Sequence, residues 1–214
     1  MRINKEALLL CSGGLDSTTL AFWLVREGIS FLPLFIDYGQ HCAVTELATA
    51  KAVLPPAVRS DLRTINISAV YRGSSSRLIS EPDLWREAVK DNDLYLPYRN
   101  ILFLSVASAY AQGQGINAVY SAFINSNHAK EIDCSAEFFH RLTALLAEYG
   151  SVEVRMPFRE LSKRRVAELA IELGVPVGST YSCQASSSIP CGACPNCVER
   201  LAALRALGGK DDQP

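Results

Sequence analysis

The sequence predicts an α/β protein with a doubly wound parallel sheet and helices on both of its faces. Short, strongly apolar runs alternate with segments of helical periodicity along the chain. The first apolar run ends in a turn with two glycines, which leads directly into a helix. Four of the seven cysteines crowd into the last part of the chain and predict a metal-binding tail. With 214 residues, the chain can form one sizeable core and a small appendage.

The charge balance argues against a nucleic-acid partner. The chain has 21 basic and 22 acidic residues, a net charge of −1 and a pI of about 6.3, so it has no long-range attraction for a polyanion. No apolar run reaches the roughly 18 residues that a membrane span needs, and the N-terminus lacks a basic and then apolar signal. We therefore expect a cytoplasmic protein with no membrane partner. A nucleic-acid substrate is disfavoured, and a local basic patch is the alternative that would allow one.

The first strand and the turn after it predict an anion-binding site. Residues 8–11 are too few and too apolar for an amphipathic helix, so we expect a buried strand there. Residues 18–25 have apolar positions at helical spacing, and Gly28 suits the end of that helix. The glycines of the turn permit close backbone approach, and the first amides of a helix lack internal partners, so together they suit phosphate or pyrophosphate. The expected nucleotide-binding residues are Ser12, Gly13, Gly14, Leu15, Asp16 and Ser17.

Asp16 is the unusual member of this turn, because a carboxylate does not by itself suit an anion site. We expect Asp16 either to brace its neighbours or to bind Mg²⁺, which would offset the phosphate charge. An ordinary turn from strand to helix, with Asp16 and Ser17 as helix-start residues, is the plainer alternative. The turn matches neither a Walker A loop nor the Gly-x-Gly-x-x-Gly fingerprint.

The second strand is predicted at 31–36 and also ends in a polar loop. Ligands collect at the carboxyl ends of the strands in a doubly wound sheet. We therefore expect Asp37, Tyr38 and Gly39 to lie beside the first turn and to bind the nucleotide. For Asp37 and Gly39, plain turn chemistry is the alternative.

The middle of the chain predicts a helix at 45–54, which two prolines stop, and a short third strand at 64–67. Periodicity then fails from 68 to 97, which indicates either a flap over the substrate or a plain insertion. A strongly apolar helix follows at 101–112. At its N-terminal end, we expect Arg99 to contact phosphate, with a structural salt bridge as the alternative.

A fourth strand is predicted at 118–123, and the polar loop after it should reach the same edge of the sheet. Its amides and polar side chains are expected to face a second substrate. The expected substrate-binding residues after this strand are Asn125, His128 and Asp133. Tyr98, which precedes the helix at 101–112, is expected to bind the substrate as well. A surface position without function is the alternative for His128. An amphipathic helix is expected at 138–149.

The last predicted strand, at 152–156, precedes a helix that begins with a lysine. Ser162 suits the N-cap of this helix, and Gly174 follows its end. Lys163 then lies in the first turn, where a cation is unfavourable against the helix dipole unless an anion is bound. We therefore expect Lys163 to bind pyrophosphate.

The cysteines of the tail are the strongest metal signal. Their spacing is Cys-x7-Cys-x2-Cys-x2-Cys, formed by Cys183, Cys191, Cys194 and Cys197. Four thiolates suit tetrahedral Zn²⁺, which would be structural because the protein fills every position. An iron–sulfur cluster is the alternative. We expect a main domain at 1–178 and a zinc-binding segment at 179–214 that packs on it.

Several motifs occur in the order of one enzyme family. They are Ser-Gly-Gly-Leu-Asp-Ser at 12–17, Asp-Tyr-Gly-Gln at 37–40, Leu-Pro-Tyr-Arg-Asn at 96–100, Asp-Cys at 133–134, Leu-Ser-Lys at 161–163 and Tyr-Ser-Cys at 181–183. The first is similar to the PP-loop of the ATP pyrophosphatases, and the series resembles the 7-cyano-7-deazaguanine synthase family over nearly the whole chain. The resemblance implies a Rossmann-like fold of the adenine nucleotide hydrolase type, Mg²⁺ with ATP, a structural Zn²⁺ and often a homodimer.

The resemblance also implies the reaction. ATP adenylates the carboxylate of 7-carboxy-7-deazaguanine, ammonia displaces AMP to give an amide, and a second ATP drives dehydration to the nitrile. The catalytic residues are then Ser12, Asp16, Arg99 and Lys163. The turn at 12–17 would hold the departing pyrophosphate together with Arg99 and Lys163. The chain departs from the family at two places. After Asp-Tyr-Gly-Gln the family usually has a basic residue and then His, whereas His41 and Cys42 follow here and the next acidic residue, Glu46, is shifted. The loop at 123–131 lacks the family's usual Asn, Asp and Tyr-Ser-Gly run.

Three other functions stay open at this stage. A divergent relative would pass the activated base to an amine of a partner protein, as members linked to bacterial defence do. A PP-loop enzyme that modifies tRNA shares the first turn but lacks electrostatic support here. A zinc-stapled nucleotide-binding module would bind ATP without releasing pyrophosphate.

Overall fold

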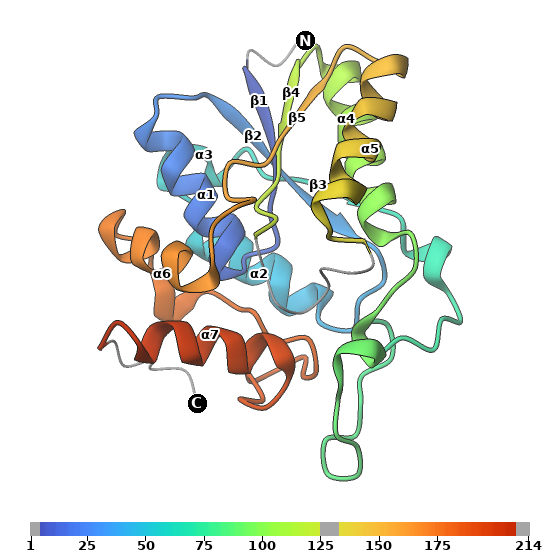
Figure 1. Ribbon diagram of the computed structural model, residues 1–214, viewed down its shortest axis with the longest axis vertical. Helices are drawn as coiled ribbons and strands as arrows, with labels where there is room; N and C mark the ends of the chain where they lie inside the picture. The colour runs from blue at the N-terminus through green and yellow to red at the C-terminus, as the bar shows by residue number, and fades with distance from the viewer. Residues whose placement is uncertain (1–4, 125–132, 209–214) are drawn as a thin grey trace.

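The computed structural model describes residues 5–124 and 133–208, and its centre is a five-stranded sheet (Figure 1). The strands are β1 (Ala7–Leu10), β2 (Phe31–Asp37), β3 (Arg63–Asn66), β4 (Ala118–Tyr120) and β5 (Glu153–Arg155). They lie in the order β3-β2-β1-β4-β5, and all neighbours are parallel. The predicted doubly wound sheet is therefore confirmed, and its strand order reverses between β1 and β4.

Helices cover both faces of the sheet (Figure 1). One face carries α1 (Leu15–Arg26), α3 (Pro56–Arg59) and α6 (Lys163–Glu172), and the other carries α4 (Arg99–Gln114) and α5 (Ala136–Tyr149). The helix α2 (Ala43–Val53) lies beside the turn after β1. Among the described residues, no helix combines the length and the apolar character needed to cross a membrane.

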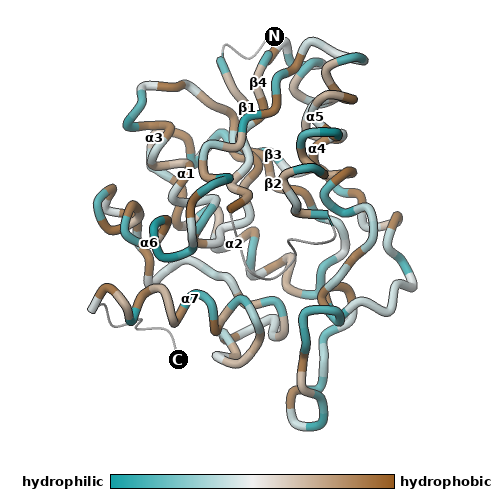
Figure 2. The backbone as a smooth tube through the Cα atoms, in the orientation of Figure 1, coloured by the Kyte–Doolittle hydropathy of each residue, from teal (hydrophilic) through white to brown (hydrophobic). Residues whose placement is uncertain are grey.

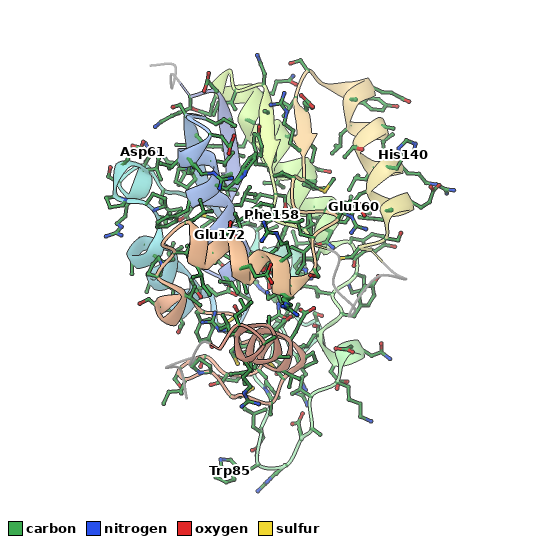
Figure 3. The ribbon with its side chains drawn as sticks, turned by 60° about the vertical axis from the view of Figure 1, so that its left-hand side comes forward. Asp61, Trp85, His140, Phe158, Glu160 and Glu172 are labelled. Carbon is green, nitrogen blue, oxygen red and sulfur yellow. The ribbon has the colours of Figure 1, made fainter. Side chains whose placement is uncertain are left out.

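The two faces of β1 explain why this strand is apolar throughout. Leu9 packs in the cluster that contains Leu20 of α1 and Val166 of α6. Leu8 packs on the opposite side, with Ala107 of α4. A strand covered on both faces needs apolar side chains in both directions. Phe158 lies in the centre of the molecule near α6 (Figure 3).

The side of α6 that faces solvent is hydrophilic. Figure 2 shows hydrophilic residues along it, and ion pairs join Arg164 to Glu168 and Arg165 to Glu172. Val166 faces the core, so the helix is amphipathic as its sequence predicts.

Several element ends differ from the predicted ones. The helix α1 begins at Leu15, three residues before its predicted start, so Asp16 and Ser17 belong to its first turn. The strand β4 ends at Tyr120 instead of residue 123, because its ladder with β5 stops there. Sequence reasoning did not predict α7 (Pro195–Arg205), whose inward side contains the buried Arg200 and so lacks a continuous apolar stripe.

The segment from 68 to 97 has a structure of its own. It contains two short 3₁₀ helices, Ser68–Tyr71 and Asp91–Leu94. Its inner part forms a small apolar cluster with Tyr38, made by Tyr71, Leu78, Leu94 and Leu96. The rest projects from the body of the molecule, and Trp85 lies at the tip with 98% of its surface exposed (Figures 1 and 3). The segment is therefore anchored beside the loop after β2.

Candidate active site

The loops that follow the strands surround a cavity of about 660 Å³. Its walls come from the turn after β1, the loop after β2, the start of α4, the chain after β4 and the tail. This is the end of the sheet where β1 and β4 diverge, and ligands bind there in doubly wound folds. The sequence-predicted residues that line the cavity are Ser12, Gly14, Leu15, Asp16, Ser17, Tyr38, Arg99, Asp133 and Lys163.

The turn after β1 is shaped by a glycine and by its own hydroxyl groups. Gly13 has a φ of +80°, and a Cβ on it would lie 2.7 Å from Ala50 N and 2.9 Å from the Glu46 carbonyl oxygen. Only glycine fits this approach to α2. Ser12 N donates a hydrogen bond to Ser17 Oγ at 3.2 Å, which closes the turn. The start of α1 is thereby placed at the cavity wall.

Lys163 reaches this turn from a distant part of the sequence. Its Nζ donates to Oδ1 and Oδ2 of Asp16, at 2.9 and 2.7 Å. Ser162 caps α6 as predicted, and its Oγ accepts a hydrogen bond from Arg165 N at 3.3 Å. The side chains of Lys163 and Asp16 are 11% and 26% exposed, so the pair is partly shielded from solvent. Asp16 therefore holds a cation beside the predicted anion site, as a bracing residue would.

Arg99 begins α4 and lies among the charged groups of the cavity. Its charge acts on the Tyr38 phenol, Glu46 and Asp133. Burial raises the pKa of Tyr38 far above its ordinary value, so the phenol stays neutral beside the guanidinium. Arg99 thus brings positive charge into the same cavity as the turn after β1.

Four predicted residues do not line the cavity wall: Gly13 of the turn after β1, and Asp37, Gly39 and Tyr98 of the surrounding loops. The Asp37 carboxylate accepts hydrogen bonds from Gly39 N at 3.0 Å and from Asn66 Nδ2 at 2.7 Å. Gly39 has a φ of +85°, which suits a tight turn. Tyr98 is 71% exposed and has a φ of +63°, the one positive value at a non-glycine residue within 5–124 and 133–208. The contacts of Asp37 and Gly39 match the turn-forming alternative.

Asp133 closes the cavity near the end of β4. It is 8% exposed, and burial raises the pKa of its carboxyl group while Arg99 opposes this rise. Asn100 Nδ2 donates to the Asp133 carbonyl at 2.9 Å and fixes the backbone there. The two other predicted substrate-binding residues, Asn125 and His128, lie outside the described residues.

Arg159 is a residue near the site that sequence reasoning missed. Its Nη2 donates to the Cys134 carbonyl at 2.7 Å, and its Nη1 donates to the Ile124 carbonyl at 3.5 Å. The guanidinium also lies 5.2 Å from the centre of the Phe139 ring. Arg159 therefore ties together the chain after β4 and the segment that contains Asp133. No motif marks this residue in the sequence.

Two polar residues of the cavity, Gln40 and Glu46, were not among the predicted site residues. Gln40 Nε2 donates to Glu46 Oε2 at 2.8 Å, and Gln40 Oε1 accepts from Tyr38 N at 2.9 Å. Burial raises the pKa of Glu46 to about 7, and hydrogen bonds from Gln40 and Cys42 together with the charge of Arg99 oppose this rise. The available signal was Glu46 as a lone charge in an otherwise uncharged stretch from 43 to 50.

The tail contacts the first turn directly. Tyr181 N donates to the Gly13 carbonyl at 3.0 Å. Arg200 of α7 is 3% exposed and donates to Thr180 Oγ1 at 2.6 Å and to the Val177 carbonyl at 2.7 Å. A buried arginine thus holds the chain segment that supports the turn after β1. The domain boundary at residue 178 stays a prediction.

The four tail cysteines form a candidate metal centre. Their Sγ atoms lie within 4.8 Å of one another, and four sulfurs around one tetrahedral Zn²⁺ lie about 3.8 Å apart. Cys191 N donates to Cys183 Sγ at 3.4 Å, and Cys194 N donates to Cys191 Sγ at 3.2 Å, which stabilises thiolate charge. An iron–sulfur cubane separates its ligands by the whole cluster, so this compact set suits one ion better. The cluster is consistent with zinc.

A family comparison matches residues 6–208 to the model of the queuosine biosynthesis protein QueC. The chain belongs to the QueC family. The 7-cyano-7-deazaguanine synthase of Archaeoglobus fulgidus is 34% identical over 96% of this chain and 88% of its own length. The synthase of Methanoregula boonei is 32% identical over 96% and 97%, and that of Campylobacter hominis is 28% identical over 98% and 99%. The family resemblance drawn from the motifs is confirmed.

Solved structures share the fold at much lower sequence identity. The structure of a 4-thiouridine synthetase bound to RNA and ATP has a TM-score of 0.52 at 17% identity, covering 79% of this chain and 41% of that chain. A predicted subunit of a tRNA methyltransferase from Methanocaldococcus jannaschii has a TM-score of 0.50 at 16% identity, covering 78% and 74%. At such identity the likeness concerns the fold alone, and it agrees with the predicted fold class.

Proposed function

We propose that the protein is a 7-cyano-7-deazaguanine synthase, which uses ATP to convert 7-carboxy-7-deazaguanine and ammonia into the nitrile. The observation that carries this proposal is the match to the QueC family over residues 6–208. The cavity supports it, because the turn after β1, Arg99 and Lys163 line one space that is large enough for small-molecule substrates.

The reaction needs the carboxylate to become an electrophile. Attack of the carboxylate oxygen on the α-phosphorus of ATP gives an acyl adenylate and releases pyrophosphate. Ammonia then displaces AMP to form the amide. A second ATP activates the amide oxygen, which leaves with AMP as the nitrile forms. The protein accelerates these steps where it stabilises the charge that develops on the leaving pyrophosphate.

The residues around the cavity suit these roles. The backbone amides at the start of α1, together with the hydroxyls of Ser12 and Ser17, would bind pyrophosphate. Lys163 and Arg99 would add positive charge. Asp16 keeps Lys163 in place and is the candidate ligand for Mg²⁺, which neutralises phosphate charge when bound. Together these groups would favour departure of pyrophosphate.

In this proposal the deazaguanine and the structural Zn²⁺ bind at different sites. We place the deazaguanine on the β4 side of the cavity, near Asp133. The tail cysteines would hold Zn²⁺ as a structural ion. Since Tyr181 in this tail bonds to Gly13, the ion would stabilise the shape of the ATP site. The family resemblance also supports a homodimer, which sedimentation of the purified protein tests.

The test is incubation of the purified protein with ATP, Mg²⁺, 7-carboxy-7-deazaguanine and ammonium, followed by mass spectrometry. We expect AMP, the amide and the nitrile. AMP without amide or nitrile would indicate a different nitrogen acceptor, such as an amine on a partner protein. If the deazaguanine does not stimulate AMP formation, the proposal is contradicted.

A matched pair of variants tests the pyrophosphate site. Lys163→Ala should lower the rate about 10²- to 10³-fold, as loss of a donor to developing charge does. Lys51→Ala, at an exposed position on α2, should leave the rate unchanged. Equal rates for both variants would exclude Lys163 from the chemistry.

A further inference from the structure

Glu46 is a half-buried residue whose carboxyl group the pyrophosphate chemistry does not use. It lines the cavity from the first turn of α2. Its backbone carbonyl lies 2.9 Å from the position that a Cβ on Gly13 would occupy. Glu46 is therefore next to the turn at which ATP is expected to bind.

The ionisable groups around Glu46 come from three parts of the chain. They are Tyr38 and Cys42 near the start of α2, Arg99 from α4 and Tyr181 from the tail. Burial raises the pKa values of Tyr38 and Cys42, so these two groups stay neutral at ordinary pH. Glu46, with a pKa raised by burial to about 7, is the member of this set that changes its charge near neutrality.

Nitrogen transfer requires a base. In neutral solution the nitrogen donor is mainly ammonium, which has no free electron pair for attack on the acyl adenylate. A group whose pKa lies near the working pH is both available as a base and strong enough to accept the proton. Asp16, another carboxylate of the cavity, already accepts hydrogen bonds from Lys163 through both of its oxygens.

We propose that Glu46 is the general base that takes a proton from ammonium in the cavity and releases ammonia next to the activated carboxylate. The proposal rests on the synthase function proposed above. Gln40 supports this role, because its Nε2 holds Glu46 Oε2 at 2.8 Å and so fixes the direction of the carboxylate. The negative charge of Glu46 would also attract ammonium into a cavity that is partly closed to solvent.

The proton and electron balance of this step is simple. The Glu46 carboxylate accepts one proton from ammonium. The free electron pair of ammonia attacks the carbonyl carbon of the acyl adenylate, forming the C–N bond. The C–O bond to AMP breaks, and its electron pair leaves with AMP. The nitrogen loses one further proton to solvent, and Glu46 returns its proton to solvent, so nothing is oxidised or reduced.

Replacing the nitrogen donor separates this role from a structural one. Hydroxylamine is largely neutral at neutral pH and attacks an acyl adenylate without help from a base. Glu46→Gln should lower amide formation from ammonium about 100-fold or more, while hydroxamate formation from hydroxylamine changes only a few-fold. Exchange of labelled pyrophosphate into ATP, which requires the deazaguanine but no nitrogen donor, should stay close to the wild-type rate. Glu160→Gln, an exposed counterpart, should match the wild type in all three assays.

The wild-type enzyme provides a test without any variant. At fixed total ammonium, the rate of amide formation should level off above about pH 7, where Glu46 is deprotonated. A rate that keeps rising in proportion to free ammonia would overturn the proposal. Glu46→Asp, which keeps a carboxylate, should restore part of the ammonium-dependent rate.

Other outcomes separate the two proposals. If Glu46→Gln loses pyrophosphate exchange and hydroxamate formation in parallel with amide formation, Glu46 supports the ATP site and is not the base. If Glu46→Gln forms the amide from ammonium as fast as the wild type does, the proposal is also overturned. If the wild-type protein shows no deazaguanine-dependent exchange, the proposed synthase function fails instead.

Discussion

Replacing Gly13 with alanine would test the close packing between the turn after β1 and α2. Gly13 has a φ of +80°, and the added Cβ would lie 2.7 Å from Ala50 N and 2.9 Å from the Glu46 carbonyl oxygen. The left-handed conformation costs an L-residue about 1–2 kcal/mol, and overpacking a close-packed site costs about 1–3 kcal/mol. Both opposing atoms belong to the backbone of a helix, so neither can rotate away. We expect the free energy of unfolding to fall by about 2–5 kcal/mol.

Alanine substitutions at two other glycines separate the conformational cost from the cost of overpacking. Gly28 has a φ of +72° and no atom within 4 Å of an added Cβ, so Gly28→Ala should cost about 1 kcal/mol from conformation alone. Gly14 has a φ of −73°, and its closest neighbour would be Ser12 Oγ at 3.3 Å. Gly14→Ala should therefore change stability by less than about 1 kcal/mol.

Urea unfolding of the zinc-loaded protein, followed by circular dichroism, measures all three variants. The expected order of stability is Gly14→Ala, then Gly28→Ala, then Gly13→Ala. If Gly13→Ala and Gly28→Ala unfold at the same urea concentration, the contact between the turn and α2 adds no strain. The packing described for this turn would then be wrong.

Three further predictions concern the metal, Glu46 and Arg159. Metal analysis should return one zinc per chain, and removal by a chelator should lower the unfolding midpoint and raise the KM for ATP together; bound iron with visible absorbance would contradict the assignment of zinc. Because burial raises the pKa of Glu46 from 4.5 to about 7, the folded state binds more protons than the unfolded state in this window, and stability falls as pH rises through it. The free energy of unfolding of Glu46→Gln should lack this pH dependence and should exceed that of the wild type by at most about 3 kcal/mol at neutral pH. If the variant and the wild type lose stability with pH in the same way, Glu46 does not cause the effect. Arg159→Leu should raise the KM for the deazaguanine more than the KM for ATP, since it removes the bonds to the Ile124 and Cys134 carbonyls; an equal rise in both constants would show a general loss of structure.

Local sequence patterns were sufficient for the sheet and most of its helices. The strand at 31–36 was recognisable because β2 is covered on both faces and must be apolar throughout. The end of β4 was not, because the ladder with β5 sets it and composition does not. The helix α7 was missed because an arginine on its buried side interrupts the pattern of apolar residues.

The sequence by itself determined the alternation of strands and helices, the glycine turn after the first strand and the four-cysteine set, because each depends on residues close together in the chain. Only the tertiary structure decided which distant groups meet. Lys163 pairs with Asp16 across 147 positions of sequence, and Arg159 reaches Cys134 from after the last strand. The raised pKa of Glu46 has the same origin, since it depends on how completely the folded chain removes water from one carboxyl group. Burial and long-range contact are properties of the packed molecule, and no local pattern encodes them.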